Sequence, residues 1–253
     1  MSGPRALISL CTYDERENLA QIVPEIRAVA PEADILVVDD GSPDGTGRLA
    51  DEFAASDPHV RVLHREGKLG LGSAIVAAFR YAIEHGYDYS LNLDADFSHP
   101  PRYIPDLLAA MDDADVAIGS RYVPGGKIEG WGPKRHFMSR GVNLYARLLL
   151  GLPTRDNSGS YRCYRVAMLE RLDFDRIRAQ GYAFMEEILS RLKRVGCRFV
   201  EVPITFEERR HGSSKIDWRE AMQALWVIFR LGIENATRRD DTPAVSRLDS
   251  DRP

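Results

Sequence analysis

The sequence predicts an α/β domain with a mostly parallel central sheet and helices on both of its faces. Apolar runs with strand character alternate with amphipathic segments of roughly 10–15 residues, the spacing typical of βαβ units. Several runs are apolar at almost every position, as expected where helices cover both faces of a sheet. With 253 residues, 44% hydrophobic and 28% charged, the chain is long enough for one such domain with a sizeable core.

The regular alternation occupies the first half of the chain. Strands are expected at residues 6–13, 33–40, 60–64, 89–96 and 115–122, and helices at 16–29, 45–56, 72–85 and 103–112. The second half is less regular, with helices expected at 138–150, 184–195 and 217–236 and strands at 158–165 and 199–206. We assign residues 1–237 to a single domain and expect the charged, apolar-poor tail at 238–253 to be disordered.

Charge and targeting patterns exclude several classes of protein. The net charge of −4 argues against a nucleic-acid-binding protein, although residues 127–147 carry five Lys or Arg against one acid, Glu129. That stretch indicates an anionic ligand or surface, and a merely solvated face explains it equally well. The three cysteines lack zinc or disulfide spacing, which predicts a reducing compartment. Without a signal-peptide pattern or an apolar run of ~18–20 residues, we expect a cytoplasmic protein, soluble or peripheral to a membrane.

Two aspartates end the expected strand at 89–96. Asp94 and Asp96 are separated by one residue, and ligands of parallel α/β sheets bind beyond the carboxyl ends of the strands. Paired carboxylates there suit a hard cation such as Mg²⁺ or Mn²⁺. A bare D-x-D is short and common, and turn formation before Pro100 and Pro101 is the alternative. Its position at the rim of the sheet favours the ligand site.

Polar residues also end three further strands, which we expect to be neighbours of the first. They are Thr12, Tyr13, Asp14 and Glu15, then Asp39, Asp40, Gly41 and Ser42, and finally Ser120 and Arg121. Asp39 or Asp40 could accept hydrogen bonds from ribose hydroxyls or base N–H groups. Basic side chains near loops suit phosphate, because the arginine fork matches its oxygens and a lysine in a Gly/Ser loop suits a mobile lid. They are Arg121, Arg135, Arg140, Arg209, Arg210 and Lys215.

Other catalytic classes have little support. The glycine-rich stretch at 65–74 is not a G-x-G-x-x-G, and the chain contains no P-loop, which argues against a dehydrogenase or a kinase. The histidines show no metal spacing, and no G-x-S-x-G elbow is present.

With these motifs in order, the chain resembles the family-2 glycosyltransferases of GT-A fold, and among them the dolichyl- or polyprenyl-phosphate mannosyltransferases. The resemblance covers about residues 5–220 and rests on eight motifs in register. They are TYDERENL, VVDDGSPDGT, KLGLGSA, LDADFSHPP, GSRYVPGG, SRGVNLYARLLLGLPTRDNSGSYRCYR, GYAFMEEI and EVPITFEERRHGSSK.

The resemblance implies a role for each matching residue. GDP-mannose would bind in a nucleotide-sugar half at 5–122, and the lipid in an acceptor half at 123–237. Tyr13, Glu15, Val38 and Asp40 would surround the guanosine. Asp94, Ala95 and Asp96 would lie at the sugar and diphosphate, with Asp94 and Asp96 as metal ligands and Asp96 the main one. Glu187 would lie near the sugar, Arg209 and Lys215 would close over the phosphates, and Arg121, Arg135 and Ser139 would hold the acceptor phosphate.

Four positions depart from the family pattern. Cys11 stands for the usual proline and Asp14 for the usual asparagine, both tolerable changes. Met185 replaces a frequent glutamine, which weakens the case for sugar-hydroxyl recognition there. Ser98 occupies the place of a metal-binding glutamine in some relatives.

The implied reaction is metal-dependent, inverting transfer of mannose from GDP-mannose to a polyprenyl or dolichyl phosphate. Catalysis is expected from Asp94, Asp96, Arg121, Arg209 and Lys215. The lipid acceptor implies contact with the cytosolic face of a membrane, made directly by the apolar segments 143–152 and 224–233 or through a separate anchoring subunit. The pattern of these two segments fits ordinary core helices equally well. Alternatives are another nucleotide sugar such as UDP-glucose, a sugar-hydroxyl acceptor, or a non-catalytic nucleotide-sugar-binding module.

Overall fold

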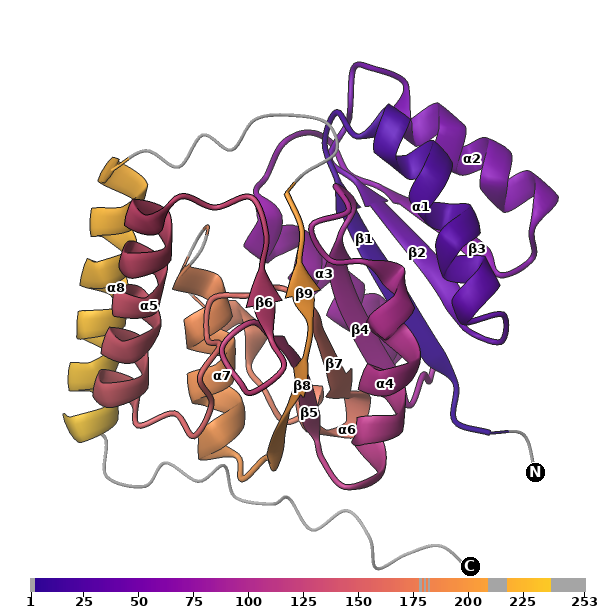
Figure 1. Cartoon of the computed structure of the whole chain (residues 1–253). Coiled ribbons are helices and arrows are strands. Elements are labelled where there is room, and N and C mark those ends of the chain that lie inside the picture. Colours follow the sequence, from indigo (N-terminus) through magenta and orange to yellow (C-terminus); the bar gives the residue numbers. More distant parts are fainter. Residues whose placement is uncertain (1–2, 178, 180, 182, 209–217, 238–253) are drawn as a thin grey trace, which may run out of the picture.

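The computed structural model describes residues 3–208, except 178, 180 and 182, and residues 218–237 (Figure 1). The tail at 238–253 and the loop with Arg209 and Lys215 therefore lie outside the described residues. Within those ranges, no helix has both the length and the apolar character that crossing a membrane requires.

The central sheet of the described chain has seven strands in the order β3-β2-β1-β4-β7-β5-β8. Every neighbouring pair is parallel except the two pairs that involve β7. The predicted mostly parallel α/β class is thus confirmed. The strands are β1 Ala6–Thr12, β2 Asp34–Asp39, β3 Val60–His64, β4 Tyr89–Asp94, β5 Val116–Ser120, β7 Arg162–Arg165 and β8 Phe199–Pro203.

Strand β7 corrects one expectation. We expected the strands at 89–96 and 115–122 to be neighbours, but β7 lies between β4 and β5 and is antiparallel to both. Cys163 is paired with Leu91 on one side and with Ala117 on the other. Because β7 runs against its neighbours, the residues just before it arrive at the carboxyl ends of β4 and β5, where the candidate site lies.

Helices cover both faces of the sheet (Figure 1). One core joins the sheet to α1 (Arg16–Val29), α2 (Thr46–Ser56) and α4 (Ile104–Ala109). The opposite face packs against α3 (Leu71–Glu84), α6 (Val166–Leu169) and α7 (Ala183–Arg194). Along β1, Ile8 joins the first core and Leu7 the second, as the two-residue period of a strand requires.

Helices α5 (Pro133–Leu150) and α8 (Trp218–Thr237) lie side by side next to α7 (Figure 1). The Tyr145 hydroxyl donates to the Leu225 carbonyl (3.5 Å), and Gly232 approaches Leu149. Helix α5 begins five residues before the expected position, since Pro133 suits the first turn of a helix. It ends at Gly151, whose φ of +61° is a common helix stop.

Short elements are the main ones that the pattern missed. The expected strand at 199–206 is two strands, β8 and β9 (Thr205–Phe206), and β9 pairs with β6 (Lys127–Ile128). Three 3₁₀ turns complete the described elements, at Pro101–Tyr103, Ala110–Asp112 and Phe174–Arg176. Elements of two to four residues are too short to produce a readable hydrophobic period.

Gly72 sets the distance between α3 and α7. A Cβ at this position would lie 2.8 Å from two ring carbons of Phe184, which is buried at the start of α7. We expect Gly72→Ala to lower the free energy of unfolding by ~1–3 kcal/mol, measured by urea denaturation, because the crowded ring must move. The matched control is Gly141→Ala in α5, where a Cβ meets nothing within 4 Å and helix propensity favours alanine. Equal stability of Gly72→Ala and the wild type would contradict this packing.

Candidate functional site

The carboxyl ends of β1, β2 and β4 meet at one edge of the sheet. Cys11 of β1 is paired with Asp94 of β4 and, on its other side, with Val38 of β2, while Thr12 is paired with Asp39. The polar residues that the sequence places after these strands are therefore brought together, as predicted. Burial and the nearby carboxylates of Asp94 and Asp40 raise the pKa of the Cys11 thiol, so it is protonated and no nucleophile at neutral pH.

The loop after β4 holds two carboxylates in different environments. The Asp94 side chain is 28% exposed, and its Oδ1 accepts from the Ser160 hydroxyl at 2.7 Å. Asp96 is buried, and its Oδ1 accepts from the Ser98 backbone N–H at 3.0 Å. Phe97, which directly follows Asp96, has a φ of +66°, an unfavourable backbone conformation for a bulky L-residue. Such strain is concentrated at functional sites.

The residues of this loop fit a hard cation. Two carboxylates supply the oxygen ligands that Mg²⁺ and Mn²⁺ take, and the buried Ser98 hydroxyl has no hydrogen-bond partner in the structure. Across the residues that the structure describes, no group of three or more His, Cys, Asp or Glu side chains could hold an ion by itself. Asp94 and Asp96 alone would therefore be an incomplete ligand set for such a cation, as is usual where substrate phosphates supply the remaining ligands.

The residues expected around a nucleotide are engaged to different extents. Asp40 is buried, accepts from the Leu69 backbone N–H at 3.0 Å and forms an ion pair with Arg65 at 2.8 Å. Tyr13 lies under the Lys68 ammonium, 4.3 Å from its ring centre. Glu15 accepts from the Asn18 amide at 2.6 Å. Val38 has no exposed surface, so its side chain belongs to the core and not to the site wall.

A hollow of about 470 Å³ lies next to these residues, at the end of β2 and the start of α2. Asp39, Gly41, Ser42 and Asp44 line it, and so do Arg48 and His64, which the sequence analysis did not select. His64 could have been selected from its position alone, because it is the last residue of β3, the strand next to β2.

Arg121 is buried in a bidentate ion pair that the sequence did not indicate. Its Nε and Nη2 lie 2.7 and 2.6 Å from the two carboxylate oxygens of Asp156, and its backbone N–H also donates to this carboxylate. Both groups are buried. Burial alone would raise the pKa of Asp156, but Arg121 and the hydrogen bonds it donates lower that pKa below the usual value. The pair is therefore fully ionised at neutral pH.

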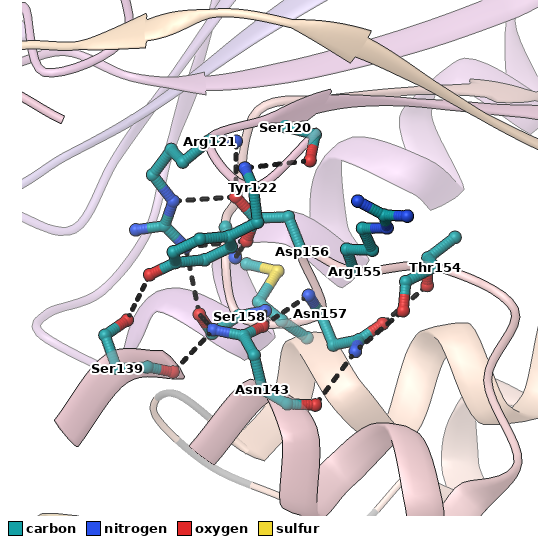
Figure 2. A network of polar contacts seen from close by, with 12 residues as sticks. Ser120, Arg121, Tyr122, Ser139, Asn143, Thr154, Arg155, Asp156, Asn157 and Ser158 are labelled. Atoms are coloured by element: carbon teal, nitrogen blue, oxygen red, sulfur yellow. Dashed lines mark hydrogen bonds and ion pairs between the residues drawn. The ribbon is translucent and has the colours of Figure 1, made fainter. Parts of the chain in front are cut away.

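A polar network joins this ion pair to helix α5 (Figure 2). Arg121 Nη2 also donates to the Ser158 hydroxyl (3.0 Å), which accepts from the Asn143 amide of α5 (3.1 Å). The hydroxyls of Tyr122 and Ser139 are 2.7 Å apart. Asn143 Oδ1 accepts from the backbone N–H groups of Asn157 and Ser158, so α5 is held against this loop.

The three expected acceptor residues are brought together by this arrangement. The Ser139 hydroxyl is hydrogen-bonded to the hydroxyl of Tyr122, the residue that follows Arg121 in the sequence. The guanidinium groups of Arg121 and Arg135 lie 5.7 and 4.0 Å from the centre of the Trp131 ring. Arginines on aromatic faces lose little conformational freedom when they bind an anion.

The two adjacent glutamates of α7 have unlike surroundings. Glu187, the expected sugar-side acid, is buried and accepts from the Ala179 backbone N–H (2.7 Å) and from Arg191 Nε (2.8 Å). Glu186 is also buried, and its Oε2 has no hydrogen-bond partner. Burial raises the pKa of Glu186 to about 8, because a charged carboxylate is poorly solvated there.

The raised pKa of Glu186 predicts a pH dependence of stability. The folded state holds this proton up to about pH 8, whereas an unfolded glutamate loses it near 4.5. Its contribution is therefore full below pH 4.5 and is lost as the pH rises towards 8, by about 1.4 kcal/mol per pH unit at most. We expect Glu186→Gln to remove this loss, so that the difference in Tm between the variant and the wild type grows from pH 5 to pH 8.5. Glu170→Gln, at an exposed position, is the control. A difference that is constant with pH would contradict a neutral buried Glu186.

Comparisons with known proteins agree with this architecture. The sequence model of glycosyl transferase family 2 matches residues 8–173. An undecaprenyl-phosphate mannosyltransferase of Micrococcus luteus is 46% identical over 90% of this chain and 94% of its own. A polyprenol monophosphomannose synthase of Mycolicibacterium smegmatis is 44% identical over 93% of this chain and 89% of its own.

Solved structures share the fold at low identity. A mannosyltransferase of Pyrobaculum calidifontis, in complex with GDP-Man and Mn²⁺, has a TM-score of 0.64 at 18% identity, over 92% of this chain and 65% of its own. Glucosyl-3-phosphoglycerate synthase of Mycobacterium tuberculosis, with Mn²⁺ and UDP, has the same TM-score and identity, over 94% of this chain and 81% of its own. The fold is therefore the predicted GT-A type. By its sequence and its fold, this chain belongs to glycosyl transferase family 2.

Proposed function

We propose that this protein transfers mannose from GDP-mannose to a polyprenyl phosphate, with inversion at the anomeric carbon. The observation that carries the proposal is the meeting of Arg121, Arg135 and Ser139 beside the edge of the sheet that bears Asp94 and Asp96. Curated relatives at 44–46% identity carry the names of polyprenyl-phosphate mannose-transferring enzymes, which supports the choice of sugar and acceptor.

The donor would bind across the ends of β1, β2 and β4. Tyr13, Glu15 and Asp40 would contact the guanosine, with Val38 limited to backbone contact because its side chain is in the core. Asp94, Ala95 and Asp96 would face the sugar and diphosphate. A divalent cation held by Asp94 and Asp96, Mg²⁺ or Mn²⁺, would neutralise charge on the leaving diphosphate. Arg209 and Lys215 would complete that neutralisation.

Glu187 would not contact the sugar itself but would hold neighbouring residues of the sugar pocket in place. Its carboxylate is engaged with Arg191 and the Ala179 backbone, so it holds the segment before α7.

The acceptor would react without a general base. A phosphate oxygen already carries much of the group's charge of about −1.5 to −2 at pH 7, so it needs orientation more than deprotonation. A sugar hydroxyl would require a base within hydrogen-bond reach. Two arginines lie against the Trp131 ring, Arg121, which is paired with Asp156, and Arg135, and none of the described side chains that pack on this ring is a carboxylate that could act as the base. This arrangement favours an anionic acceptor over a hydroxyl.

Two variants separate donor binding from acceptor binding. We expect Arg135→Ala to raise the KM for undecaprenyl phosphate about tenfold with an unchanged Kd for GDP-mannose, because a charge-assisted contact to phosphate is lost. Asp96→Asn should lower transfer ~10²-fold or more, because the diphosphate loses its charge neutralisation. The measurement is the organic-phase count from radiolabelled GDP-mannose with the lipid in detergent and Mg²⁺ or Mn²⁺.

Lys134→Ala, which removes the neighbouring exposed cation, is the matched control. An Arg135→Ala variant that loses donor binding and acceptor use equally would contradict the assignment. Transfer from UDP-glucose but not from GDP-mannose would show that the proposed donor is wrong. The absence of any metal-dependent transfer would indicate a binding module.

We also propose that the protein lies on the cytosolic face of a membrane through α5 and α8. These adjacent helices expose apolar side chains at helical spacing, Phe137, Leu144 and Leu148 on α5 and Met222, Trp226, Phe229 and Ile233 on α8. Exposed apolar side chains in such number are unusual for a free surface. A lipid acceptor would be reached from this side, and an anchoring subunit is the alternative occupant.

The apolar contribution to membrane binding is testable by flotation. We expect Leu148→Ser/Trp226→Ser, two of the most exposed apolar residues of α5 and α8, to reduce flotation with neutral phosphatidylcholine vesicles in high salt several-fold, since buried apolar area is lost. Leu69→Ser/Leu71→Ser, an exposed apolar pair near the start of α3, is the control and should float like the wild type. Wild-type protein that does not float would contradict direct membrane contact and would favour an anchoring subunit.

A further inference from the structure

A pocket of about 320 Å³ lies between α5 and the loop that follows β5. Four arginines line it, Arg121, Arg140, Arg147 and Arg155, together with Tyr122 and Leu144. Its volume is at the lower end of the roughly 300–1,000 Å³ of small-molecule sites. The pocket shares Arg121 with the expected acceptor site, but Arg135 and Ser139 do not line it, so the two sites differ in their other residues.

The positive charge of this pocket is largely uncompensated. Arg121 is neutralised by Asp156. Arg140, Arg147 and Arg155 form no ion pair with any acid in the described part of the chain. Three unpaired guanidinium groups around one hollow repel one another, in a protein whose net charge is −4. A bound anion would relieve that repulsion.

The backbone that carries these arginines is held in place. Arg140 and Arg147 are seven residues apart, two turns of α5, and so lie on the same side of the helix. Asn143, between them, is buried and bonded to the loop at 157–158. The Arg155 backbone N–H donates to Glu201 of β8 at 2.9 Å. A preformed frame lowers the conformational cost of binding an anion.

The rim of the pocket suits a phosphate that bears a hydrocarbon chain. Leu144 lies between Arg140 and Arg147 and is 55% exposed, and Leu148 one turn further along α5 is 73% exposed. We infer that this pocket is a second anion site, in which Arg140, Arg147 and Arg155 bind the phosphate group of an anionic phospholipid or a free phosphate. This inference does not depend on the transferase activity proposed above.

The test compares two variants with the same change in charge. Arg140→Gln/Arg147→Gln/Arg155→Gln removes the three unpaired guanidinium groups, and Arg61→Gln/Arg80→Gln/Arg171→Gln removes three exposed arginines outside the pocket. Binding of inorganic phosphate is measured by ³¹P NMR line broadening. Binding of lipid is measured by flotation with phosphatidylglycerol vesicles in phosphate-free buffer, against phosphatidylcholine vesicles.

We expect the pocket variant to bind phosphatidylglycerol vesicles at least tenfold more weakly than the wild type, with phosphatidylcholine binding and the control variant unchanged. Loss of phosphate binding without loss of vesicle binding would identify a free anion as the ligand of the same site. A pocket variant that retains both would overturn the inference. So would a rise in the KM for undecaprenyl phosphate in detergent equal to the loss of vesicle binding, because the pocket would then be the acceptor site itself. Mannosyl transfer by the wild type is measured in a separate assay. A failure of the transferase proposal would therefore not change the interpretation of the anion-binding experiment.

Discussion

The buried ion pair between Arg121 and Asp156 is the interaction on which the acceptor side of the molecule depends. Removing two charges from water is costly, and only close geometry with additional hydrogen bonds offsets that cost. Here the contact is bidentate, and Asp156 also accepts from the backbone N–H groups of Arg121 and Gly159. Its own N–H donates to Glu201 of β8, which also accepts from the Ser120 hydroxyl. The pair therefore ties the end of β5, the segment before β7 and strand β8 into one unit.

This unit also reaches the donor side. The antiparallel course of β7 carries Ser160 to the end of β4, where its hydroxyl binds Asp94 and its carbonyl accepts from Asn92. The same segment, 156–160, thus contacts Asp94, a predicted donor-side carboxylate, at one end and Arg121, a predicted acceptor arginine, at the other. Both substrates would be positioned by one short, buried stretch of chain. A relative displacement of the two sites would then require breaking hydrogen bonds that have little access to water.

Sequence patterns predicted the fold class and the gathering of polar residues at one edge of the sheet, where the candidate site lies. Each of these follows from local periodicity and from the rule for parallel sheets. The partner of Arg121 could not be predicted, because Asp156 lies 35 residues away and is brought near by a strand inserted between two others. The family resemblance singled out Glu187, but the helical pattern alone could not indicate that its neighbour Glu186 is buried without a hydrogen-bond partner for Oε2 among the described residues. Adjacent helix residues point in different directions, and only the tertiary packing sets their surroundings.

The two aspartates at the end of β2 differ in their capacity to recognise a nucleotide. An ionised carboxylate can accept about four hydrogen bonds. Asp39 already accepts from the Thr12 and Ser42 hydroxyls and from the Ser42 N–H, so its oxygens serve the turn itself. Asp40 accepts one hydrogen bond, from Leu69, and its Oδ1 contacts Arg65 without hydrogen-bond geometry. Asp40 thus keeps more acceptor capacity than Asp39, and a base or ribose N–H or O–H would find its acceptor there. Sequence spacing left the choice between the two residues open, and the hydrogen bonds that each already makes favour Asp40 as the nucleotide-side acceptor.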